Sequence, residues 1–204
     1  MASITRQVLA SSDDCRRWYY TSEQFSLTSG EFEAGASNLY PKDGSGARFP
    51  NITIPKGATI ENGTHLTLRC RYATDGVIVK SRISADDVDD ALTFSTVEDF
   101  DTRYAARTTA RVNWDSIPAW TVNVEYDSPE IKSVIQEIVN RAGWVSGQAL
   151  AIFWEDFEGR SSKVSKSYRR AYSYNGSVEF APKLVIAYTP PVVAVGRSFG
   201  FIIG

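Results

Sequence analysis

One segment of the chain, residues 128–141, has the periodicity of a one-sided helix. Its aliphatic side chains recur every three or four positions, at Ile131, Val134, Ile135, Ile138 and Val139. Ser128 precedes the first turn as a candidate N-cap, and Pro129 stands where a missing N–H costs no hydrogen bond. The pattern predicts an amphipathic helix over 128–141 that packs its aliphatic face on a sheet.

Most of the remaining chain has strand-like patterns. Residues 66–72 alternate apolar and polar side chains, as a strand with one buried face does. Residues 149–154 and 184–188 are apolar on both faces, which favours central strands covered on each side. Many short strands with turn signals between them, plus one helix, predict an all-β, jelly-roll-like β-sandwich.

The segment between residues 107 and 124 predicts two further inward-facing rows. One row consists of Ala110, Val112 and Trp114, and the next of Trp120, Val122 and Val124. Trp144, at the exit of the predicted helix, is also expected in the core. The pattern does not decide whether Trp154 faces the core. The tryptophans thus predict an aromatic core.

Length and charge limit the class of protein. A chain of 204 residues fits one large all-β domain, which we expect to span residues 1–189, followed by a tail at 190–204. A net charge of −2 with interspersed signs argues against a nucleic-acid partner. No run approaches the ~20 apolar residues of a membrane span. The first residues lack the apolar core of a secretion signal, so we expect synthesis and folding in a cytoplasm.

Cys15 and Cys70 are too few for a disulfide framework. Cys70 shares the inward face of its predicted strand with Leu66 and Leu68, as a buried structural thiol does. We expect both thiols to be free, with a bridge between them as the alternative.

The sequence offers little of the chemistry that an enzyme needs. His65 is the only histidine, and no nucleophile-elbow motif is present. Acidic pairs on loops are more often solvated than catalytic. The loop 86–90 carries four aspartates and is the alternative site for calcium, but it lacks the spaced ligands of a calcium loop. We therefore predict a non-enzymatic protein with no metal and no cofactor.

The tail after Thr189 is unusually apolar. It follows two prolines, is too short to span a bilayer, and is too apolar to be left in water. It is either an extra strand of its own sheet or a strand donated to a neighbouring subunit. The second interpretation makes candidate partner-binding residues of Val192, Val193, Val195, Phe199, Phe201, Ile202 and Ile203.

Trp18, Tyr19 and Tyr20 form a run of consecutive aromatic residues. Aromatic faces stack on sugar rings, so this run is the candidate carbohydrate-binding surface. The alternatives are that the rings pack the N-terminal segment onto the sandwich, or that they form a patch between subunits.

Three groups of segments together resemble a known family of modules. Residues 11–14 precede 48–60 (RFPNITIPKGATI), residues 128–147 hold SPEIKSVIQEIVNRAGWVSG, and residues 170–177 (RAYSYNGS) precede 181–188 (APKLVIAY). Together they resemble DNRLRE-type β-sandwich modules, which are similar to carbohydrate-binding jelly rolls, over residues 4–189. The resemblance implies an accessory or stalk domain of a secreted or cell-surface protein, or a stand-alone structural protein of a tailed phage. It transfers no catalytic or sugar-binding residue.

The function expected first is a structural or adhesive component of a phage particle, such as a capsid decoration protein or a tail or fibre subunit. Its partners would be other virion proteins or copies of itself, and it would be assembled in the host cytoplasm and located in the virion. The alternative is an extracellular carbohydrate-binding module that binds a surface glycan. Neither function involves nucleic acid or a membrane.

Overall fold

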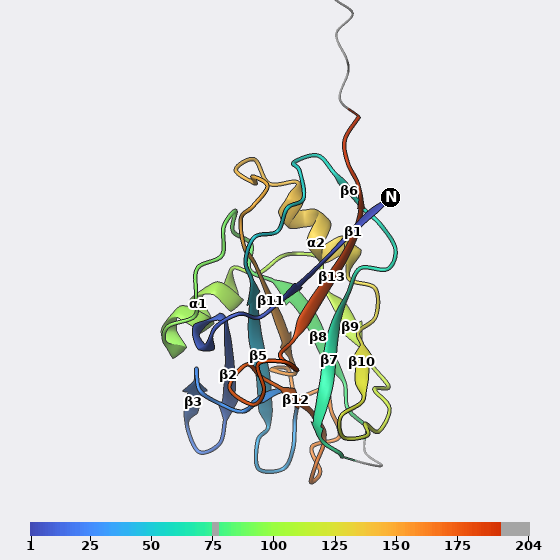
Figure 1. Ribbon diagram of the computed structural model, residues 1–204. Helices are drawn as coiled ribbons and strands as arrows, with labels where there is room; N and C mark the ends of the chain where they lie inside the picture. Colours follow the sequence, from blue (N-terminus) through green and yellow to red (C-terminus); the bar gives the residue numbers. More distant parts are fainter. Residues whose placement is uncertain (75–77, 193–204) are drawn as a thin grey trace, which may run out of the picture.

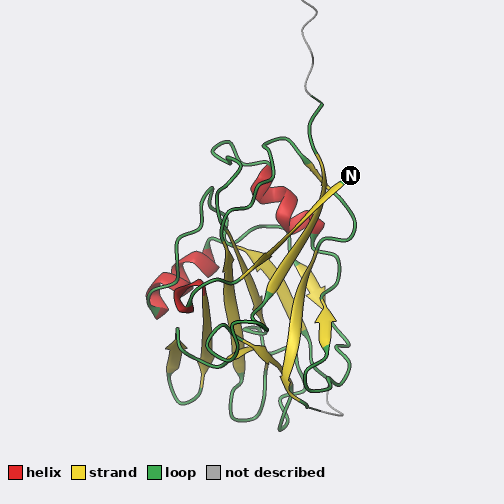
Figure 2. Ribbon diagram, viewed as in Figure 1, coloured by secondary structure: helices red, strands yellow, loops and turns green. Residues whose placement is uncertain are grey.

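The computed structural model describes residues 1–74 and 78–192, and this part of the chain forms a curled antiparallel sheet of 13 strands with two α-helices (Figures 1 and 2). The strands are β1 (Ala2–Gln7), β2 (Asp14–Tyr19), β3 (Glu23–Ser26), β4 (Glu31–Gly35), β5 (Lys42–Phe49), β6 (Thr59–Ile60), β7 (His65–Tyr72), β8 (Ser81–Ala85), β9 (Val112–Trp114), β10 (Glu125–Asp127), β11 (Leu150–Glu155), β12 (Tyr168–Tyr172) and β13 (Lys183–Thr189). The helices are α1 (Val97–Ala105) and α2 (Lys132–Val139), and a 3-10 turn spans Ser11–Asp13. The predicted all-β, sandwich-like fold is confirmed.

The strands follow one path, β1-β13-β7-β12-β4-β5-β11-β8-β9. Strand β2 also pairs with β5 and carries β3, while β10 pairs with β7 and β6 with β13. The first and last strands lie side by side, in register from Ala2 opposite Tyr188 to Gln7 opposite Lys183. Because the sheet curls, side chains of β7 and β13 share one core with those of β5, β8 and β11.

Trp154 of β11 lies at the centre of this core. Its ring is fully buried and lies 5.8 Å from Phe32, 5.9 Å from Trp120 and 5.7 Å from Trp114. Its indole N–H donates to Ser81 Oγ at 2.7 Å, so the polar atom of the ring is satisfied. The aromatic core predicted from the tryptophans is confirmed, and Trp154 belongs to it.

The predicted amphipathic helix forms as α2, and its aliphatic face is buried against the sheet (Figure 2). Its predicted start at residue 128 is wrong, because the helix begins at Lys132. The Ser128 hydroxyl accepts from the N–H of Leu66, and the Glu130 carboxylate accepts from two amides of the preceding loop. These contacts hold residues 128–131 against the entry to β7 and outside the helix.

The expectation of a single helix is wrong, since α1 is a second one in the described part of the chain. Thr96 caps it by accepting from the N–H of Asp99 at 3.2 Å. Phe100 is its only buried residue, but Val97, Phe100 and Tyr104 recur every three or four positions, a short helical pattern that the prediction overlooked. Neither of the helices in the described residues is long and apolar enough to cross a membrane.

The inward row predicted at Val122 and Val124 is wrong, because each of these side chains is 43% exposed. After the buried Trp120, Asn123 takes a φ of 65°, and the Val124 N–H donates to the carbonyl of Thr121. This turn interrupts the alternation and delays the next strand to β10.

Cys15 and Cys70 are both buried and free, as predicted. Burial raises the pKa of each thiol above its ordinary value. Of the candidate partner-binding residues, only Val192 is described, and it is 96% exposed. Val193, Val195, Phe199, Phe201, Ile202 and Ile203 lie outside the described residues, so the role of the tail stays a prediction.

Candidate functional site

Four strands bring charged side chains together near one end of the sheet. Arg16 of β2 binds Asp43 of β5 through two hydrogen bonds, Nε–Oδ1 at 3.1 Å and Nη2–Oδ2 at 2.6 Å. Its Nη1 lies 3.3 Å from a carboxylate oxygen of Glu31, and its Nη2 lies 3.3 Å from Glu33. The Nε of Arg170, on β12, donates to Glu33. We call this set the ionic cluster: Arg16, Glu31, Glu33, Asp43 and Arg170.

Strand pairing fixes the geometry of the ionic cluster. Glu33 and Arg170 are directly opposite each other in the β4–β12 ladder. The Ser45 hydroxyl binds both the N–H and the C=O of Glu33, at 2.8 and 2.9 Å, and so ties β4 to β5. Strand pairing thus fixes where each charged side chain leaves the main chain, and the hydrogen bonds within the cluster hold the side chains themselves.

Burial dominates the electrostatics of the ionic cluster. Glu33 is fully buried and Asp43 is 1% exposed. Burial, with a further contribution from the nearby Asp43, raises the pKa of Glu33 to about 8 against the opposing effects of Arg16 and Arg170. Burial also raises the pKa of Asp43, although Arg16 opposes this. The ionic cluster contains three carboxyl groups but only two guanidinium groups. One carboxyl group therefore lacks a cation of its own and retains its proton most readily.

Aromatic rings surround the ionic cluster. The guanidinium carbon of Arg16 lies 4.8 Å from the centre of the Trp18 ring and 5.8 Å from that of Tyr40. The guanidinium carbon of Arg170 lies 4.2 Å from the ring of Tyr168. The Tyr20 ring lies 5.8 Å from Tyr40. We call these four side chains the aromatic rim: Trp18, Tyr20, Tyr40 and Tyr168.

The structure divides the predicted aromatic run of Trp18, Tyr19 and Tyr20 between two faces. Trp18 and Tyr20 contact members of the rim or the cluster, whereas alternation along β2 directs Tyr19 to the opposite face of the strand. Sequence reasoning missed Tyr40 and Tyr168. No local signal marked them, because they join the rim only through the pairing of distant strands.

The side chains of the aromatic rim are partly exposed, whereas Arg16, Glu33 and Asp43 of the ionic cluster are buried. Tyr20 is 52% exposed, Trp18 is half-buried, and the neighbouring Leu39 is 56% exposed. Such a surface offers ring faces for stacking, with phenol hydroxyls and the partly exposed Glu31 for hydrogen bonds. Flat, weakly charged molecules with both apolar faces and polar edges fit this arrangement.

The aspartates of the loop 86–90 make structural contacts. Arg141 binds Asp87 at 2.5 Å and Asp89 at 2.8 Å, and Asp90 accepts from the N–H of Ala149 at 2.8 Å. Among the residues that the structure describes, no group of three or more His, Cys, Asp or Glu side chains is arranged to hold a metal ion. Calcium in this loop stays an untested alternative.

No protein-family model and no curated protein matches this chain. The resemblance to DNRLRE-type modules therefore stays a prediction.

Proposed function

We propose that this protein is a non-enzymatic binding module that recognises carbohydrate through the aromatic rim. The observation that carries the proposal is the arrangement of Trp18, Tyr20 and Tyr40 around the guanidinium of Arg16. Aromatic rings present apolar faces to the C–H face of a sugar, and nearby polar groups bind its hydroxyls. The ionic cluster supports the rim from behind, so that the rings need little ordering when a ligand binds.

The charge of the ionic cluster favours neutral or amino sugars over acidic ones. Arg16 and Arg170 are already engaged by carboxylates, and Glu31, with 24% of its side chain exposed, is the carboxylate nearest to solvent. An acidic sugar would meet this carboxylate without finding a free guanidinium.

A glycan array tests the proposal. We expect the wild-type chain to bind a set of neutral glycans, and Trp18→Ala to reduce this binding by about tenfold or more, since stacking on one ring contributes roughly 1–3 kcal/mol. Tyr172→Ala is the matched control, because Tyr172 lies on β12 outside the rim. Equal binding by the wild type and Trp18→Ala, or no glycan bound by either, would contradict the proposal.

A second candidate function is a structural or adhesive part of a phage particle. Val192, an apolar residue that is 96% exposed after two prolines, favours it. An exposed apolar side chain is stabilised by burial against another subunit. We expect sedimentation to show self-association of the full chain and a monomer for a variant that lacks residues 192–204. A full chain that sediments as a monomer, and binds no other virion protein, would exclude this candidate.

A further inference from the structure

Strand β1 is an edge of the sheet. In the described part of the chain it pairs with β13 alone, and it stands at the end of the strand path (Figure 1). The side chains of Ser3 and Thr5 are exposed. We propose that this edge of one copy accepts residues 192–204 of a second copy as an additional strand. The inference rests on the second candidate function, self-association through that segment, and names the surface to which the segment binds.

The ladder between β1 and β13 shows which main-chain groups of β1 point outward. Just beyond β1, the N–H of Val8 donates to the carbonyl of Pro182 at 3.1 Å. In an antiparallel ladder, pairs that exchange hydrogen bonds alternate with pairs that do not. The register therefore directs the N–H and C=O groups of Ser3 and Thr5 away from β13. In agreement, Ala187, which is opposite Ser3, binds with its N–H and C=O to the loop between β6 and β7.

Arg6 closes one end of this free edge. Its Nη1 donates to the carbonyl of Thr5 at 3.0 Å, and its Nε donates to the carbonyl of Asn51 at 2.7 Å. Edge strands usually avoid a further strand through charged side chains, prolines or bulges. Between Ala2 and Thr5, β1 has no charged side chain, no proline and no break in its register. The N–H and C=O of Ser3 and the N–H of Thr5 are thus directed toward an incoming strand.

Composition and direction identify the incoming strand. Residues 192–204 include three valines, two isoleucines and two phenylalanines, which are residue types that favour strands. A strand antiparallel to β1 runs in the same direction as β13, from the Gln7 end of β1 toward Ala2. The chain leaves β13 at Thr189, next to the Ala2 end, so its own segment starts at the wrong end of the edge and would have to reverse and run parallel to β1. The segment of a second copy can enter at the Gln7 end and form the more stable antiparallel pairing.

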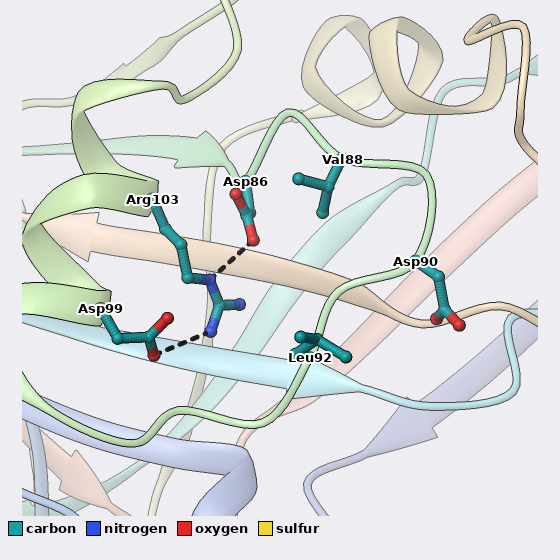
Figure 3. A pocket seen from close by; sticks show the side chains of 6 residues that line it. All are labelled: Asp86, Val88, Asp90, Leu92, Asp99 and Arg103. Atoms are coloured by element: carbon teal, nitrogen blue, oxygen red, sulfur yellow. Dashed lines mark hydrogen bonds and ion pairs between the residues drawn. The ribbon is translucent and has the colours of Figure 1, made fainter.

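The pocket between α1 and the loop that follows β8 is a poorer acceptor for this segment. Its volume is about 210 Å³, and Figure 3 shows the side chains that line it: Asp86, Val88, Asp90, Leu92, Asp99 and Arg103. Apolar side chains buried there would displace water from charged groups, at a cost in free energy. The edge of β1 instead offers main-chain hydrogen bonds that any strand can use.

Sedimentation velocity with complementary variants tests the inference. Thr5→Pro removes an outward N–H that the pairing with β13 does not use, and Thr5→Ala is the matched control. We expect the full chain and Thr5→Ala to self-associate, and Thr5→Pro to associate at least about tenfold more weakly. The chain without residues 192–204 should be a monomer alone and should bind Thr5→Pro, because one supplies the edge and the other the segment. Leu92→Arg, which changes an exposed residue of the pocket, should associate like the full chain.

Equal association of Thr5→Pro and Thr5→Ala would overturn the inference and leave the second candidate function standing, since the segment would then bind another surface. The absence of a complex between Thr5→Pro and the shortened chain, a loss of association in Leu92→Arg, or a monomeric full chain would also overturn it. If Thr5→Pro does not fold, amide exchange decides. The amides of Ser3 and Thr5 should exchange at least about tenfold more slowly in the full chain than in the shortened chain, and equal rates would overturn the inference.

Discussion

Replacing Arg16 by methionine is expected to lower the free energy of unfolding by about 3–5 kcal/mol at neutral pH. The side chain of Arg16 is 8% exposed and contacts three carboxylates, and two of these, Glu33 and Asp43, are almost completely buried. Its removal leaves the buried Asp43 without its principal counter-charge, and the variant must either protonate or hydrate this side chain; Glu33, with a pKa of about 8, already holds its proton most of the time at this pH. Urea denaturation followed by tryptophan fluorescence measures the loss.

Lys183→Met is the matched control for Arg16→Met. Lys183 pairs with Glu125 at 3.0 Å, but both side chains are substantially exposed, so we expect a loss under about 1 kcal/mol. The double variant Arg16→Met with Asp43→Asn should recover part of the stability, because it removes the charge left behind. A loss for Arg16→Met no larger than that for Lys183→Met would contradict the importance of the ionic cluster.

The free energy of unfolding is expected to fall by about 2–3 kcal/mol between about pH 5.5 and about pH 7.5. Burial raises the pKa of Glu33 from 4.5 to about 8 in the folded chain. The folded state therefore holds this proton more tightly than the unfolded state does. The resulting stability is complete below about pH 4.5 and is lost as the pH rises through about 8. Urea denaturation across this range measures the slope.

Other buried carboxyl groups also make the free energy of unfolding fall as the pH rises. Burial raises the pKa of Asp14 to about 7, opposed by a hydrogen bond from the N–H of Tyr174 and assisted by Asp13. Burial also raises the pKa of Asp43 and Glu155. Glu33→Gln is the control, because it keeps the shape of the side chain and cannot ionise. The variant should show a shallower slope, and an unchanged slope or a stability that rises with pH would contradict the assignment.

The sequence predicted the fold where burial follows a simple period. The aliphatic face of α2 and the apolar strands β11 and β13 are found where the spacing of their side chains placed them. α1 was missed, although Val97, Phe100 and Tyr104 recur every three or four positions and the rings of Phe100 and Tyr104 both pack on Phe153. Val122 and Val124 misled the prediction because the alternation continues in the sequence after the strand has given way to a turn.

The candidate site was predictable only in part. Trp18 and Tyr20 form a recognisable aromatic run, but Tyr40 and Tyr168 join them only after folding. Arg170 and Glu33 are 137 positions apart in the chain and meet through the β4–β12 ladder. Such long-range pairings depend on strand order, which local periodicity does not specify.

The ionic cluster and the aromatic rim have linked roles in this account. Buried charges rarely add much stability over apolar residues of the same size, so a function that requires a fixed guanidinium explains their presence better than folding alone. Arg16 binds carboxylates with its nitrogen atoms and presents its planar face to Trp18 and Tyr40. On the proposed function, the cluster holds the rim in the geometry that a flat ligand requires.

The most direct test of the central claim follows the indole N–H resonances of the five tryptophans during titration with the strongest glycan from the array. Trp114, Trp120, Trp144 and Trp154 are at most 6% exposed, so only Trp18 can contact a ligand without unfolding. The account predicts a saturable shift of the Trp18 resonance with the other four unchanged. A glycan that binds while the Trp18 resonance stays in place would contradict it.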